Sequence, residues 1–154
     1  MAYLSQMHGE VFDEKATVLK NFEDAGFDTD DQVIAYLKTY GFEEELIYSS
    51  VCDLSGGEKN LLQLAKISRT GAGLLLLDEP TSHLDTYSQL ALEQAVEKYN
   101  GTVLMVSHDF YTVANCMDYV LLTEDKGLRK VSMRKFRKMI YADHFDKDYL
   151  EYEQ

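Results

Sequence analysis

Cysteine, proline and glycine are scarce in this chain of 154 residues, and each shortage excludes a class of protein. The two cysteines, Cys52 and Cys116, are too few and too far apart for a disulfide framework. We therefore expect a reducing compartment, with both thiols buried as small hydrophobic groups. One proline and nine glycines exclude a fibrous or low-complexity chain.

Long apolar runs are also lacking. The longest, Leu74–Leu77, is far shorter than a membrane span. The first residues, Met1–Gln6, lack the basic segment of a signal peptide. We therefore expect a cytoplasmic protein with no membrane insertion. The length and the 45% apolar content are those of one domain with its own core.

Positive charge is scarce overall, with 15 basic against 27 acidic residues and a net charge of −12. Such a charge disfavours non-specific binding to nucleic acid or anionic lipid. Residues 1–58 carry 13 acids and three lysines, whereas residues 126–138 carry seven bases and no acid. The basic block can contact a phosphate backbone or form a solvated helix face. The absence of interleaved aromatic residues favours the solvated face.

The first part of the chain reads as a strand followed by helices. Ala2–Leu4 suits a strand, and residues 13–25 and 30–40 suit helices. Asp30 or Asp31 can cap the second helix, and Gly41 ends it. The pattern predicts a small helical bundle with an acidic exterior.

From Ser55 onward, helices and strands alternate. The run Leu74–Leu77 predicts a central parallel strand buried on both faces, and residues 102–106 predict a second buried strand. The alternation is typical of an α/β layer. The other expected helices span about 55–68, 86–99 (Leu90, Leu92, Ala95 and Val96 inward), 110–116, 132–142 and 146–152, and the other strands span 119–122 and 128–131.

Three polar clusters stand where these elements begin or end. Ser55-Gly56-Gly57 opens a helix, where glycines and free N–H groups can receive a phosphate, although in isolation a plain serine cap with a glycine-rich turn is the favoured explanation. Asp78-Glu79 leaves the leucine strand at its carboxyl end, where one acid can hold Mg²⁺ and the other can polarise a water. His108 follows the next strand and can donate to a phosphoryl oxygen.

Together, these segments resemble the motifs of ABC-type ATPases in order and spacing. LSGGEK at Leu54–Lys59 resembles the signature motif, and LLLLDEPT at Leu74–Thr81 resembles the Walker B motif. Ser82–Asp85 resembles the D-loop, Ser107–Asp109 resembles the H-loop, and Gln6 matches the Q-loop glutamine.

The resemblance covers nearly all of residues 1–125 and is strongest to the ABC-F subfamily. Those proteins are soluble tandem ATPases, many of which act on the ribosome. Ser82 and Leu61 depart from the usual ABC-F pattern of asparagine and arginine. The implied fold is α/β, a partial P-loop NTPase core with an α-helical subdomain. It divides residues 1–154 into a signature subdomain (about 10–70), a Walker B and H-loop core (about 71–131) and C-terminal helices (about 132–154).

The resemblance also implies ATP and Mg²⁺ as ligands, with roles for individual residues. Gln6 would position Mg²⁺ or the attacking water, Asp78 would support Mg²⁺, and Glu79 would be the general base. His108 would contact the γ-phosphate.

The remaining implied roles lie across an interface between two ABC domains. Ser55, Gly56 and Gly57 would close on the γ-phosphate of nucleotide held by a second, opposing ABC domain. Asp85 would couple the two sites across that interface.

The phosphate-loop pattern G-x-x-x-x-G-K-[ST] is absent from the sequence. In the family this loop precedes the Q-loop, so the chain resembles the carboxyl-terminal portion of an ABC domain. We predict that the isolated chain binds ATP weakly or not at all and does not hydrolyse it. In the family, the strand that carries this loop lies beside the strand that precedes the H-loop. Its absence would leave a gap beside residues 102–106 that invites self-association.

Two other functions stay open at this stage. One is the ATP-binding subunit of an ABC membrane transporter, whose helical region would dock a permease. The other is a non-catalytic remnant that offers Ser55–Gly57 to a partner.

Overall fold

The computed structural model describes residues 1–4, 8–82 and 84–144. By packing, the chain divides into two units, Met1–Ser107 and His108–Gln154. Each unit contains its own cluster of buried hydrophobic residues.

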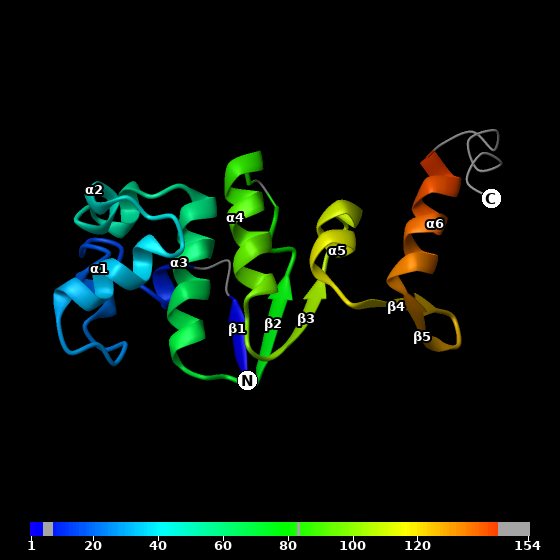
Figure 1. The fold of residues 1–154 in the computed structure, drawn as a ribbon, viewed down its shortest axis with the longest axis horizontal. Coiled ribbons are helices and arrows are strands. Elements are labelled where there is room, and N and C mark those ends of the chain that lie inside the picture. Colours follow the sequence, from blue (N-terminus) through cyan, green and yellow to red (C-terminus); the bar gives the residue numbers. More distant parts are fainter. Residues whose placement is uncertain (5–7, 83, 145–154) are drawn as a thin grey trace. The chain divides into compact units, whose positions relative to one another are not determined.

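The first unit contains a three-stranded parallel sheet in the order β1-β2-β3 (Figure 1). These strands are β1 (Ala2–Leu4), β2 (Leu74–Asp78) and β3 (Thr102–Val106). The leucine run is therefore the central strand of the described sheet, which confirms that prediction. Leu4 pairs with Leu77, and Leu77 pairs with Met105.

The two faces of this sheet differ, which corrects the prediction of strands buried on both faces. Leu4, Leu75 and Leu77 are fully buried, beside the helices α3 (Gly56–Arg69) and α4 (Thr86–Glu97), which run side by side (Figure 1). On the opposite face, Tyr3 is 53% and Leu104 is 49% exposed. Among the described strands, β3 pairs only with β2.

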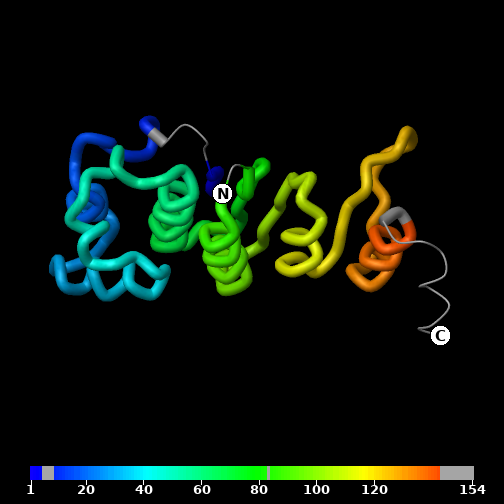
Figure 2. The backbone as a smooth tube through the Cα atoms, turned by 90° about the horizontal axis from the view of Figure 1, so that it is seen from above, coloured from blue at the N-terminus to red at the C-terminus, as the bar shows by residue number. Residues whose placement is uncertain are grey.

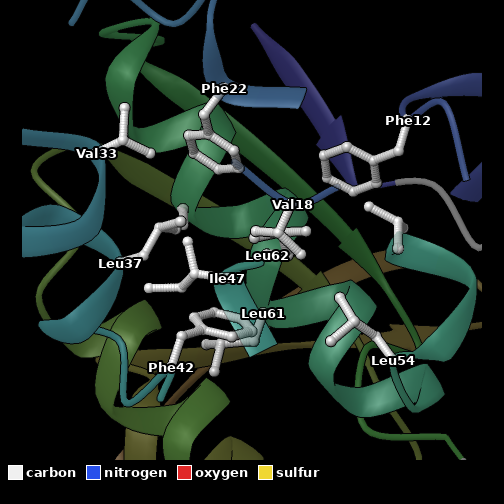
Figure 3. Packing of buried hydrophobic residues seen from close by; sticks show 12 residues of the cluster. Phe12, Val18, Phe22, Val33, Leu37, Phe42, Ile47, Leu54, Leu61 and Leu62 are labelled. Atoms are coloured by element: carbon white, nitrogen blue, oxygen red, sulfur yellow. The ribbon is translucent and has the colours of Figure 1, made fainter. Parts of the chain in front are cut away.

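The helical part of the first unit surrounds a separate core, in which aromatic and aliphatic side chains point toward one another (Figure 3). Its elements are α1 (Asp30–Lys38), α2 (Glu44–Ile47), the first half of α3, and three short 3-10 helices, η1 (His8–Glu10), η2 (Lys20–Phe22) and η3 (Val51–Asp53). The buried residues of this core are Phe12, Val18, Phe22, Val33, Leu37, Phe42, Ile47, Val51, Leu54, Leu61, Leu62 and Ala65.

The predicted helix over residues 13–25 is wrong. The segment contains only η2, because part of its backbone pairs with a distant segment. Val18 N–H donates to the Ser49 carbonyl, and Leu19 N–H donates to the Ile47 carbonyl, both at 3.0 Å. These long-range bonds use the donors that a helix would need.

Three smaller predictions are corrected. Thr29, rather than Asp30 or Asp31, caps α1, because its hydroxyl accepts from Gln32 N–H while the two acids occupy the first turn. Cys52 is exposed. Leu90 is 53% exposed, because α4 turns the face of Ser88, Leu92 and Val96 inward.

The second unit packs two helices against an antiparallel hairpin. The hairpin strands are β4 (Tyr119–Glu124) and β5 (Gly127–Ser132), and the helices are α5 (Phe110–Cys116) and α6 (Met133–His144). The chain passes directly from β5 into α6 (Figure 2). A small core forms around Val113, Val131 and Phe136. The helix expected over residues 146–152 lies outside the described residues.

None of the helices in the described ranges combines the length and the apolar character needed to cross a bilayer.

Candidate functional site

The signature segment forms the amino end of α3 and carries a complete capping box. Ser55 Oγ accepts from Glu58 N–H at 3.1 Å, and Glu58 Oε1 accepts from Ser55 N–H at 3.0 Å. Ser55 therefore does cap the helix. It does not exclude ligand binding, because the cap uses only a lone pair and the hydroxyl hydrogen can still be donated. Ser55 and Gly56 are both exposed.

The two glycines of the segment do different things. A Cβ on Gly57 would meet Ser88 Cβ at 2.6 Å and Leu84 Cδ2 at 3.0 Å, whereas a Cβ on Gly56 would meet nothing within 4 Å. Gly57 therefore lets α3 approach the beginning of α4. Gly56 leaves open space in which another molecule can approach the backbone.

Asn60 joins the same helix to the turn after β2, a link that the sequence motifs did not indicate. Its side chain is only 8% exposed, and Nδ2 donates to the Pro80 carbonyl at 3.2 Å. Within the described residues, Oδ1 is buried without a hydrogen-bond partner. Its position three residues after Gly57, on the buried face of α3, was the available signal.

Asp78 and Glu79 stand at the carboxyl end of β2, as predicted. Asp78 is exposed, and its backbone lies opposite Val106 of β3. Glu79 has a φ of 46°, in the left-handed region, and its N–H donates to the Val106 carbonyl at 2.8 Å. A left-handed non-glycine residue costs about 1–2 kcal/mol, and such residues cluster at functional sites.

Asp85 caps α4 and thereby connects the D-loop segment to the signature helix. Its Oδ1 accepts from Ser88 N–H at 2.7 Å. The hydrogen bonds from the Ser88 amide, and then from the Ser88 hydroxyl, hold the pKa of the Asp85 carboxyl below its ordinary value. Ser88 is the residue that Gly57 approaches, so the structure brings the beginnings of α3 and α4 together.

Of the two remaining predicted site residues, the structure describes one. His108 is exposed at the start of the second unit, one residue before Asp109. Asp109 caps α5 by accepting from Tyr111 N–H at 3.1 Å and Thr112 N–H at 3.2 Å. Gln6 lies outside the described residues.

The donor set at the end of β2 suits Mg²⁺ held together with a phosphate. Across the described residues, no group of three or more His, Cys, Asp or Glu side chains can hold a metal ion on its own. Mg²⁺ needs only one or two carboxylates when phosphate oxygens and waters complete its shell. The exposed carboxylate of Asp78 fits that requirement, whereas the sequence offers no phosphate loop.

The fold is that of known ABC ATP-binding domains. The ATP-binding cassette MJ0796, whose dimer was solved in a post-hydrolysis state with ADP and Pi, matches with a TM-score of 0.66 and 22% identity. That match covers 86% of this chain and 62% of the other. cbiO1 from Clostridium perfringens, part of the ABC transporter complex cbiONQ, matches with a TM-score of 0.71 and 19% identity, over 98% and 65% of the two chains.

Sequence comparison identifies the family. ABC transporter F family member 5 of Arabidopsis thaliana is 40% identical over 80% of this chain, and ATP-binding protein Uup of Escherichia coli (strain K12) is 35% identical over 82%. Elongation factor 3 of Zygosaccharomyces rouxii is 39% identical over 66%. The chain spans only 18%, 21% and 10% of these relatives. The ABC transporter family model matches residues 1–82, and the chain therefore belongs to the ABC transporter family, with most resemblance to its F subfamily.

Proposed function

We propose that this chain supplies the signature, Walker B, D-loop and H-loop portion of an ATP-hydrolysing domain in a cytoplasmic ABC-F protein that acts on the ribosome. The complete protein pairs two ABC domains. The observation that carries the proposal is the backbone of Glu79, held left-handed at the end of the leucine strand by a hydrogen bond to β3. That strained backbone does not stabilise the folded chain, but it sets the direction in which the Glu79 side chain leaves the strand end.

The adjacent acids would divide the chemistry. Asp78 would hold Mg²⁺, which neutralises phosphate charge when bound, and Glu79 would orient the attacking water and accept its proton. Gln6 would position the metal or the water. His108 would donate to a phosphoryl oxygen of the transferred group.

The beginning of α3 would act on nucleotide bound by the opposing domain. The amide of Gly56, the hydroxyl of Ser55 and the open space beside Gly56 suit a γ-phosphate. Gly57 would serve by keeping α3 tight against α4. Asp85, at the start of α4, would couple the two nucleotide sites across the interface between the ABC domains.

The lack of a phosphate loop sets the expectation for the isolated chain. Losing the loop's charge-assisted hydrogen bonds, each worth about 1.5–3 kcal/mol, should remove useful ATP affinity. We expect calorimetry with Mg-ATP to show no micromolar binding and no turnover. Micromolar affinity would overturn this part of the proposal.

The hydrolytic role of Glu79 is testable in a protein in which this chain is joined to a phosphate-loop segment. Glu79→Gln should lower kcat by about 10²–10⁴-fold, because it removes the proton acceptor while ATP binding persists. Glu97→Gln, at the exposed end of α4, is the matched control and should leave kcat unchanged. Equal rates for the two variants would contradict the proposal.

The ribosomal role is supported by the F-family relatives and by a relative named as an elongation factor. We expect the complete protein to co-sediment with ribosomes and not with membranes that contain a permease. Co-sedimentation with the membranes alone would favour a transporter subunit. Association with neither, together with no ATPase activity, would favour a non-catalytic remnant.

A further inference from the structure

We propose that the outer face of α6 binds the phosphate backbone of RNA. This basic face consists of four side chains of the helix, all of them exposed: Arg134, Lys135, Arg137 and Lys138. The choice of RNA rests on the proposed ribosomal function, whereas the surface itself rests on the charges and contacts described below.

The helix separates apolar from basic residues. Phe136 is 5% exposed and packs in the small core with Val113 and Val131, and Met133 and Ile140 pack against that core. Arg134, Arg137 and Lys138 follow the spacing i, i+3, i+4, which places them on one side of a helix. The apolar residues are used within the second unit, and the charged ones are presented outward.

The positive charge of this face is not neutralised within the described part of the chain. No described acid forms an ion pair with any of the four side chains. Arg137 Nη2 donates to the Ala114 carbonyl at 2.7 Å, which orients the guanidinium and leaves its charge uncompensated. By contrast, Arg129 on the neighbouring hairpin pairs with Glu124 at 2.6 Å.

The stability of the helix does not explain these residues. Arg134 and Lys135 lie in the first turn of α6, where the helix dipole disfavours cations. Arg134 and Lys138 are like charges at i, i+4, which weakens a helix further. Three unfavourable placements on one face point to a ligand that supplies negative charge from outside.

RNA suits the surface better than a lipid bilayer does. The inward side chains of α6 are occupied by the core, so the helix has no apolar face left to insert into lipid. Exposed tyrosines accompany the charges, which the sequence pattern had not indicated. Tyr141 is 54% exposed, and Lys130 Nζ lies 4.0 Å from the centroid of the 48% exposed Tyr119 ring. Such rings can stack on unpaired bases.

The experiment measures binding of the intact chain to a short fluorescein-labelled single-stranded RNA by anisotropy, without nucleotide. We expect Arg134→Gln/Lys138→Gln to weaken binding about tenfold or more at about 50 mM salt and to reduce the salt slope by about 1.4, which is about 0.7 for each lost contact to a single strand. Its thermal midpoint should not fall, because both substitutions relieve unfavourable charge. The matched control, Lys15→Gln/Lys20→Gln, removes the same charge from exposed sites in the first unit and should bind as the unmodified chain does.

Equal weakening by the two double variants would show that overall charge alone attracts RNA, and no weakening by either would show that α6 does not bind it. Vesicles rich in anionic lipid form the other arm of the test. Tighter binding to vesicles than to RNA, lost in the α6 variant, would assign the surface to a membrane and overturn the proposal. Because ATP is absent, failure here leaves the ATPase proposal untouched, and loss of ATPase activity leaves RNA binding untouched.

Discussion

The helical part of the first unit and its parallel sheet differ in how completely their apolar side chains are buried. The helical part closes a core of twelve buried residues drawn from residues 12–65 (Figure 3). The sheet buries Leu75 and Leu77 on one face, but on the other it leaves Leu104 49% and Val106 57% exposed. The helical region therefore buries its core side chains, whereas the sheet leaves the apolar side chains of one face partly exposed.

The difference follows from the kind of structure in each region. Helices close a core with neighbours that are near in sequence, whereas a parallel sheet needs a layer on both faces and strands brought from a distance. The division also matches the proposed chemistry. The signature helix belongs to the helical region, and the acids at the end of β2 belong to the sheet.

The largest expected effect tests this difference directly. Leu62 is fully buried in the helical core, so Leu62→Ala should lower the free energy of unfolding by about 2–5 kcal/mol. Leu104→Ala, at the exposed face of the sheet, should cost less than about 1 kcal/mol. Urea denaturation measures both. Similar costs would break the comparison, because they would show that the exposed face is covered in solution.

The next effect concerns the contact between α3 and α4. Gly57→Ala should destabilise the chain by about 1–3 kcal/mol, because its Cβ would overlap Ser88. Gly56→Ala meets open space and should be neutral or slightly stabilising. Thermal melts of the two variants separate packing from backbone flexibility. Equal melting temperatures would mean that the close approach of the helices is not needed for stability.

A smaller effect is expected where α3 contacts the turn after β2. Asn60→Ala removes the hydrogen bond to the Pro80 carbonyl and should cost about 1–2 kcal/mol. The cost is moderated because Oδ1 is already buried without a partner among the described residues. Urea denaturation measures it. A cost as large as that of Leu62→Ala would show that the contact of Asn60 with the turn after β2 stabilises the fold as much as core packing does.

The parts of the fold that depend on local chemistry could be predicted from the sequence. Ser55 and Glu58 form the capping box that begins α3, and the leucine run forms β2, because periodicity and caps act within a few residues. The position of Asp78 and Glu79 at the end of a strand followed from that run.

The rest depended on contacts between distant segments. Residues 13–25 did not form a helix, because Val18 and Leu19 bond to the segment around Ile47 and Ser49. The overlap of Gly57 with Ser88 requires knowing that two helices meet. The left-handed backbone of Glu79 could not be predicted, since glutamate has no preference for it.

The smallest expected effect is a pH dependence at the junction between the two regions. The pKa of Asp85 is lowered from its ordinary value of 3.8 by hydrogen bonds from Ser88. A carboxyl with a lowered pKa stabilises the folded chain above its ordinary pKa, and this contribution is lost as the pH falls through the lowered value. Asp85→Asn keeps a capping oxygen but does not titrate. The native chain should therefore resist urea slightly better than Asp85→Asn at pH 7, and the advantage should disappear between about pH 5 and the lowered pKa. All other carboxyls are common to both proteins, so the difference isolates Asp85. An advantage that stays constant down to the lowest pH would mean that the cap does not depend on the charge, and that acid leaves the junction between sheet and helices intact.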